Sequence, residues 1–116
     1  MGLPFSESHH HLDQAGEAID LLCRRGLLPV LGELSRHTLR HNELARGTGL
    51  DSKQLSRALR HALSANLIDR NVSGSQMPVC VYYQLTKRGE ELISALGPLA
   101  AWYGTYQEPP TSATQP

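Results

Sequence analysis

The chain has 116 residues, no net charge at neutral pH, and a composition that is 40% hydrophobic but only 5% aromatic. This length suits one domain with a core built mostly from aliphatic side chains. The sequence has no run of about 20 apolar residues, no basic-then-apolar leader and only two cysteines, so we expect no membrane partner, no secretion, no disulfide framework and a cytoplasmic location.

The zero net charge hides an uneven distribution along the chain. Residues 36–71 hold seven Lys and Arg against three Asp and Glu, a balance of +4, whereas residues 1–35 have a balance of −3. The distribution of charge matters more than its total for binding a polyanion, because phosphates attract local clusters of cations. Any nucleic-acid surface is therefore expected within residues 36–71.

The two ends of the chain differ in composition from its middle. Residues 1–13 are polar and include the run His9–His11, and residues 107–116 hold three prolines with Ser, Thr and Gln. Such composition predicts flexible segments on either side of a domain that spans residues 14–106. Adjacent histidines without a rigid partner lack a tetrahedral geometry, so we predict neither a metal nor another cofactor.

Two helices are predicted before the basic segment. The first fits Gln14 to about Arg24, and the second fits about Leu28 to Arg36. Pro29 is tolerated in the first turn of the second helix, because the N–H that proline lacks has no helical partner there.

The stretch from His41 to Leu63 predicts a helix, a Gly-rich turn and another helix. Asn42 is expected to cap the first of these helices, because its side-chain oxygen can accept a free backbone N–H. Gly47 and Gly49 are expected to form the turn, since positive φ costs glycine little.

The helix after this turn has two faces of opposite character. Asp51 or Ser52 can cap it, and with Asp51 as the cap Gln54 completes a variant of the capping box. Helical spacing predicts a buried face formed by Leu55, Ala58, Leu59, Ala62 and Leu63. The opposite face holds Lys53, Arg57, Arg60, His61 and Ser64. This layout is typical of a DNA-binding helix-turn-helix, although a solvated surface helix has the same two faces.

The pattern then changes from helix to strand. Leu67–Val72 and Val79–Leu85 are rich in β-branched and aromatic residues, and the polar loop 73–78 joins them. Two strands directly after a helix-turn-helix make a wing, and Thr86 is expected to cap a last helix from about Lys87 to Tyr103. The predicted fold is mainly α, of the α+β type: a winged helix-turn-helix with a two-stranded wing and a C-terminal helix.

Three stretches share their residues and spacing with a known family. They are Ala18-Ile-Asp-Leu-Leu with Val30-Leu-Gly-Glu-Leu34, then Asn42-Glu-Leu44 through Leu55-Ser-Arg-Ala-Leu59 to Asn66-Leu-Ile-Asp-Arg70, and finally Pro78 with Val81, Tyr83, Leu85, Thr86 and Gly89. In these motifs residues 14–104 resemble the HxlR-type winged helix-turn-helix regulators of the broader MarR-like group.

The resemblance implies a homodimeric transcriptional regulator that binds double-stranded DNA, with helix 52–64 in the major groove and the 73–78 loop at the neighbouring groove or backbone. The predicted DNA-contacting residues are Asn42, Ser52, Lys53, Gln54, Ser56, Arg57, Arg60, Arg70, Ser75 and Gln76. The predicted dimer interface, in which the last helix pairs with the first, is Ile19, Leu22, Leu92, Leu96, Leu99, Trp102 and Tyr103. Packing of these apolar residues onto the domain's own core is the alternative.

The sequence departs from the family pattern at several positions. The family's Lys-Trp-Thr is Arg25-Gly26-Leu27 here, Cys23 ends the first helix in place of a Cys-Pro before it, and Cys80 replaces a basic wing residue. No catalytic motif surrounds the Ser, His or Asp residues, so we predict no enzyme. One alternative stays open: a winged-helix module for protein interaction, or for sensing redox state or an unknown small-molecule effector, that has lost strong DNA binding.

Overall fold

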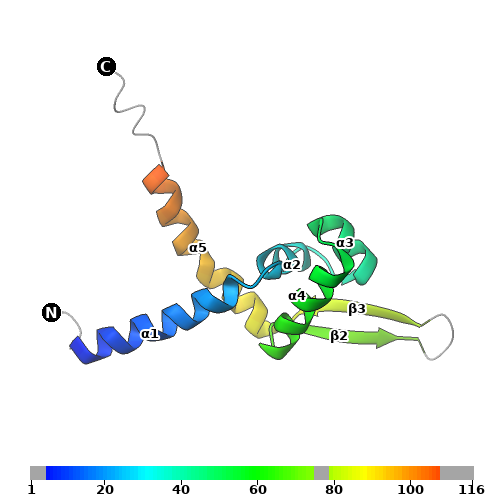
Figure 1. Ribbon diagram of the computed structural model, residues 1–116, viewed down its shortest axis with the longest axis horizontal. Helices are drawn as coiled ribbons and strands as arrows, with labels where there is room; N and C mark the ends of the chain where they lie inside the picture. Colours follow the sequence, from blue (N-terminus) through cyan, green and yellow to red (C-terminus); the bar gives the residue numbers. More distant parts are fainter. Residues whose placement is uncertain (1–4, 75–78, 108–116) are drawn as a thin grey trace, which may run out of the picture.

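The computed structural model describes residues 5–74 and 79–107 (Figure 1). Its elements in chain order are α1 (Phe5–Leu22), α2 (Leu27–Leu34), β1 (Leu39–Arg40), α3 (His41–Thr48), α4 (Ser52–Ser64), β2 (Ile68–Ser73), β3 (Cys80–Leu85) and α5 (Lys87–Gln107). Figure 1 shows α2, α3 and α4 gathered into one body, from which the β2–β3 hairpin extends on one side while α1 and α5 extend on the other. The predicted mainly helical fold with a wing is confirmed.

The core forms where the apolar face of α4 meets α2. On α4 the buried side chains are Leu55, Ala58, Leu59 and Ala62, and on α2 they are Leu27, Val30, Leu31 and Leu34. Leu44 of α3, Ile68 of β2 and Tyr83 of β3 complete the same cluster. The prediction that Leu63 is buried was wrong: it lies at the edge of the stripe, next to the last residue of α4, and is 36% exposed.

The start of α4 agrees with the sequence analysis and the start of α3 does not. The Asp51 carboxylate accepts the Gln54 N–H at 2.7 Å, and the Gln54 side-chain oxygen accepts the Asp51 N–H at 3.2 Å. In α3 the cap position is Arg40, whose N–H donates to the Glu43 carboxylate at 2.8 Å. Asn42 is therefore the second helical residue and not the cap, because Glu43 satisfies the free N–H from within the helix.

The turn between α3 and α4 needs only one of the two predicted glycines. Gly49 ends α3 with φ of 74° in the left-handed region, as predicted. Gly47 lies inside α3 instead, and a Cβ there would collide with the Glu33 side chain of α2. The nearest atoms belong to the carboxylate end of the flexible Glu33 side chain, which can move aside, so this contact does not by itself require glycine.

The three strands form one antiparallel sheet in the order β1-β3-β2. The hairpin register runs from Ile68 opposite Leu85 to Ser73 opposite Cys80, close to the predicted strands. The short strand β1, which pairs Leu39 with Tyr83, was not predicted, because two residues carry no periodic signal.

The outer helices are longer than predicted. Helix α1 begins at Phe5 and not at Gln14, so residues 5–13 are helical where the sequence analysis expected a flexible segment. No proline or glycine interrupts the chain between Phe5 and Ala15, and polar composition alone does not end a helix. Helix α5 continues to Gln107 with Pro98 in its interior. Residues 108–116 of the predicted tail and residues 75–78 of the predicted loop lie outside the described residues.

One corner ties the end of the wing to the end of α4. The Thr86 hydroxyl donates to the Asn66 carbonyl at 2.8 Å and accepts the Gly89 N–H at 3.0 Å, which confirms Thr86 as the cap of α5. The Thr86 N–H donates to the Leu67 carbonyl at 3.0 Å. Gly89 is buried against this corner, and a Cβ there would collide with the Leu67 carbonyl.

Gly89→Ala is therefore expected to lower the free energy of unfolding by about 1–3 kcal/mol, because an added methyl group in a packed site forces backbone shifts. Gly97→Ala in the same helix is the matched control, since nothing lies within 4 Å of a Cβ there. The control is expected to leave stability unchanged or to raise it by up to about 1 kcal/mol. Urea unfolding of both variants tests this, and equal effects would contradict the account of the corner.

Candidate nucleic-acid interface

The exposed face of α4 holds five of the ten predicted DNA-contacting residues. Ser52, Lys53, Ser56, Arg57 and Arg60 are all exposed, on the side opposite the buried stripe. Within residues 11–74 and 79–105, whose side chains the structure describes, the single ion pair joins Arg40 to Glu43, at 4.0 Å. The cations of α4 therefore have no carboxylate partner in this part of the chain, and the helix presents uncompensated positive charge to the solvent.

Gln54 has a different setting from its neighbours on α4. It is half-buried, and its side-chain oxygen already accepts the Asp51 N–H. The two-bond pairing of a glutamine with adenine uses both the oxygen and the amide group. Such a contact would require the cap of α4 to open, whereas the amide N–H₂ alone remains available to a DNA acceptor.

The other predicted contacts lie on different elements. Asn42 is exposed in the first turn of α3, and Arg70 is exposed on β2 opposite Tyr83. Ser75 and Gln76 lie outside the described residues. Seven of the predicted residues thus lie on α3 and α4, and Arg70 lies on the wing.

A hollow of about 490 Å³ lies between α3 and the wing, and two arginines that the sequence analysis did not select line it. Arg40 and Arg46 line it together with Asn42 of α3 and Cys80 of β3. Both arginines are exposed. Arg40 and Arg46 both lie in the positively charged segment 36–71, so the sequence indicated that they could contact DNA. Only the fold shows that they border the wing.

His61 is not on the exposed face of α4, contrary to prediction. It is half-buried, and its Nδ1 atom is buried without a hydrogen-bond partner in the described part of the chain. Burial lowers the pKa of His61 below 6.5, and the nearby positive charges of Arg24, Arg60 and Arg57 lower it further. The imidazole is therefore held neutral in the folded chain at a pH where an exposed histidine begins to protonate.

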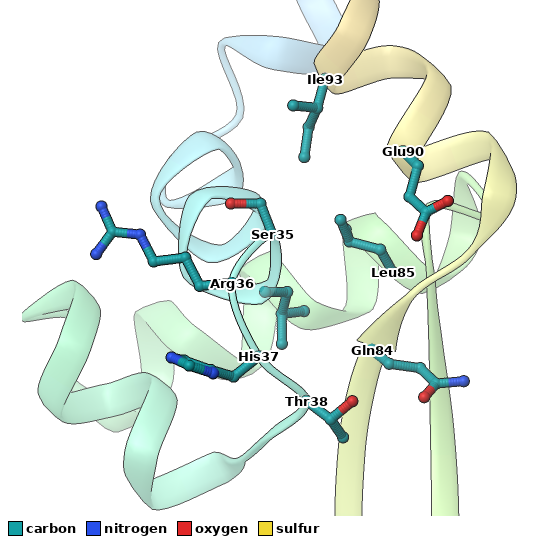
Figure 2. A pocket seen from close by; sticks show the side chains of 9 residues that line it. Ser35, Arg36, His37, Thr38, Gln84, Leu85, Glu90 and Ile93 are labelled. Atoms are coloured by element: carbon teal, nitrogen blue, oxygen red, sulfur yellow. The ribbon is translucent and has the colours of Figure 1, made fainter.

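A second hollow, of about 510 Å³, lies between the α2–β1 connection, the end of β3 and α5. Figure 2 shows Leu85 and Ile93 directed into it, while the Arg36 and His37 side chains extend away from Glu90. The lining of this hollow is mixed, because polar side chains from the α2–β1 connection and Glu90 border it together with Leu85 and Ile93. Cys23 is exposed and Cys80 is half-buried, both as free thiols.

The described part of the chain holds neither a metal-binding cluster nor a membrane-spanning helix. The described residues hold no group of three or more His, Cys, Asp or Glu side chains with the arrangement of a metal site. Among the same residues, no helix is both long enough and apolar enough to cross a membrane.

A second candidate surface lies on α1 and α5. Four of the predicted dimer residues are more than half exposed: Ile19, Leu99, Trp102 and Tyr103. Leu22 and Leu92 are partly buried against the core, and Leu96 is half-buried. The apolar side chains nearest the body therefore pack on its core, whereas those farther along α1 and α5 lie on the surface.

These features define the class of the protein: a winged helix-turn-helix with an exposed cationic second helix. The chain belongs to the HxlR-like helix-turn-helix family, whose sequence profile matches residues 21–111. A helix-turn-helix transcriptional regulator of Mycobacterium tuberculosis strain H37Rv is 33% identical over 94 residues, which are 81% of this chain and 59% of that relative. The chain thus spans somewhat more than half the length of this curated relative.

Solved structures of regulators have the same fold. A transcriptional regulator of the MarR family from Enterococcus faecalis matches with a TM-score of 0.78 and 28% identity, over 84% of this chain and 88% of that one. The reduced form of the transcriptional regulator YodB from Bacillus subtilis matches with a TM-score of 0.71 and 26% identity, over 94% of this chain and 98% of that one. The family and these relatives are transcriptional regulators and not enzymes.

The half-buried His61, whose Nδ1 atom is buried, predicts a pH dependence of stability. Its pKa is lowered in the folded chain, so the unfolded chain takes up the proton first as the pH falls through 6.5. The contribution of His61 to stability is thus present above pH 6.5 and is lost as the pH falls toward its lowered pKa. His61→Gln is expected to lose less free energy of unfolding between about pH 8 and pH 5.5 than the unaltered chain.

Urea unfolding at both pH values measures this difference. His37→Gln is the control, because His37 is exposed in the α2–β1 connection. The same pH dependence in the His61 variant and the unaltered chain would show that the imidazole is not held neutral.

Proposed function

We propose that this chain is a sequence-specific DNA-binding transcriptional regulator that acts as a homodimer and inserts α4 into the major groove. One observation carries the proposal. The cationic face of α4 is exposed and lacks carboxylate partners in the described chain, while the opposite face is fixed in the core. Membership of the HxlR-like family supports it.

Some side chains of α4 suit contacts with bases, and others suit contacts with phosphates. Arg57 and Arg60, near the middle of α4, can each donate two hydrogen bonds to a guanine edge. Ser52 and Lys53 in the first turn suit phosphate oxygens, which fix the register of the helix without reading sequence. The adjacent DNA backbone or groove is proposed to be contacted by Asn42, by Arg70 and by the 73–78 loop. Ser75 and Gln76 are the proposed contacts within that loop.

The apolar surface of α1 and α5 supports the homodimer. The radius of gyration is 18.4 Å, against about 13 Å for a compact chain of about 100 residues, because both helices extend from the body. Exposed apolar side chains clustered on such extensions are typical of an interaction surface. A two-fold dimer would place its two α4 helices on half-sites about one DNA turn apart.

The same role implies the domain bounds and the location of the protein. We propose that residues 14–106 form the DNA-binding domain and that the protein acts in the cytoplasm of a bacterial cell. Binding of a small-molecule effector, whose identity is unknown, remains a prediction from the sequence. The alternative of a protein-interaction module without DNA binding is less favoured, because it leaves the uncompensated cations of α4 without a role.

Arg57→Ala is expected to weaken binding to the duplex upstream of the protein's own gene by about 1–3 kcal/mol, if Arg57 reads a base edge. The melting temperature should hardly change, because Arg57 is exposed. Arg36→Ala, an exposed arginine in the α2–β1 connection, is the control and should bind normally. Gel shifts at stated salt concentrations give both affinities, and binding that is indifferent to salt would contradict a phosphate-contacting surface.

Replacing Leu99 and Trp102 together with glutamate is expected to give a folded monomer that binds its operator poorly. Both side chains are more than half exposed, so the body keeps its core. Leu28→Glu, an exposed leucine of α2, is the control and should leave the dimer intact. Sedimentation equilibrium at tens of micromolar protein decides the matter, because an unaltered chain that sediments as a monomer there would rule out the dimer.

A further inference from the structure

We propose that the α1–α2 turn, residues 23–26, is a second DNA-contacting element, in which Arg24 binds a backbone phosphate beside the groove that α4 occupies. The inference rests on the proposed function and extends it to a segment outside the helix-turn-helix. Arg24 is not among the residues that the sequence analysis selected, because it lies in residues 1–35, where acidic residues outnumber basic ones.

The turn is held directly against α4. A Cβ on Gly26 would lie 2.7 Å from Leu50 Cδ1 and 3.2 Å from Ala58 Cβ on the buried face of α4, so the backbone of the turn packs closely against that helix. Gly26 also has φ of 82°, in the left-handed region. Two backbone hydrogen bonds order the turn: Arg24 N–H to the Leu21 carbonyl at 3.1 Å, and Leu27 N–H to the Arg24 carbonyl at 3.0 Å.

This placement adds Arg24 to the positive charge of α4. Arg24, Arg57 and Arg60 all lie near enough to His61 for their charges to act on its imidazole. All three arginines are exposed, and none has an ion-pair partner among the described residues. Like charges on neighbouring elements repel one another, and a bound anion relieves that repulsion.

The dimensions of duplex DNA indicate which anion this is. An α-helix with its side chains is about 10–12 Å across, and the major groove is about 12 Å wide. A helix seated in the groove therefore fills it, and a residue on a neighbouring turn meets the bordering phosphates and not the bases. The guanidinium fork of arginine matches phosphate oxygens with two hydrogen bonds.

The test compares Arg24→Gln with Arg36→Gln, which removes the same charge from another exposed connection. Affinity is measured against salt concentration for the specific duplex and for an unrelated duplex. Arg24→Gln is expected to weaken both several-fold and to reduce the slope of log affinity against log salt by about one, as the loss of one phosphate contact predicts. Arg36→Gln should change neither, and thermal unfolding should match the unaltered chain for both.

Arg57→Gln separates failure of this inference from failure of the proposed function. If Arg57→Gln weakens specific binding while Arg24→Gln binds like the control, α4 contacts DNA and the turn does not. If neither variant differs from the control, the DNA-binding role of α4 fails as well. Equal losses of affinity for Arg24→Gln and Arg36→Gln would show a non-local charge effect and would overturn the inference. A loss of affinity for the specific duplex alone in Arg24→Gln would also overturn it, because a phosphate contact does not depend on sequence.

Discussion

Burial of one face of α4 against α2 determines which residues are left to meet another molecule. Leu55 and Ala58 are completely buried, and in a helix of 3.6 residues per turn this directs Arg57 and Arg60 outward. The Asp51 cap sets the first residue of the helix, so it also sets which side chains occupy the first turn. A shift of one residue along α4 would rotate the cations by about 100° and bury part of the charged face.

Two further features place the other elements around α4. The corner at Thr86 joins the end of α4, the start of β2 and the start of α5 through the Asn66 and Leu67 carbonyls. The Gly26 contact holds the α1–α2 turn on the same helix. Because the connections to both α1 and α5 lie against α4 or its end, a displacement of these outer helices has a direct physical route to the exposed cationic face of α4.

Local patterns in the sequence predicted the elements whose cause is local. The period of Leu55–Ala62, the Asp51 cap and the Thr86 cap all depend on residues within a turn of one another, and all agree with the structure. One local feature, the cap of α3 at Arg40, was nevertheless mispredicted. Features that depend on distant residues were missed: β1 forms by pairing with Tyr82 and Tyr83, and the tertiary neighbours of His61 leave it half-buried. Most of the exposed α4 face was therefore predictable, whereas the positions of Arg24 near α4 and of Arg40 beside the wing were not.

The central claim is that the exposed face of α4 is the surface that meets DNA. Titrating the isotopically labelled chain with its upstream duplex, and following the backbone amide signals by NMR, tests this most directly. The account predicts that the largest changes fall on residues 52–60, with further changes at residues 23–25 and little change at residues 99–105 near the end of α5. Changes confined to α1 and α5, with α4 unaffected, would contradict it.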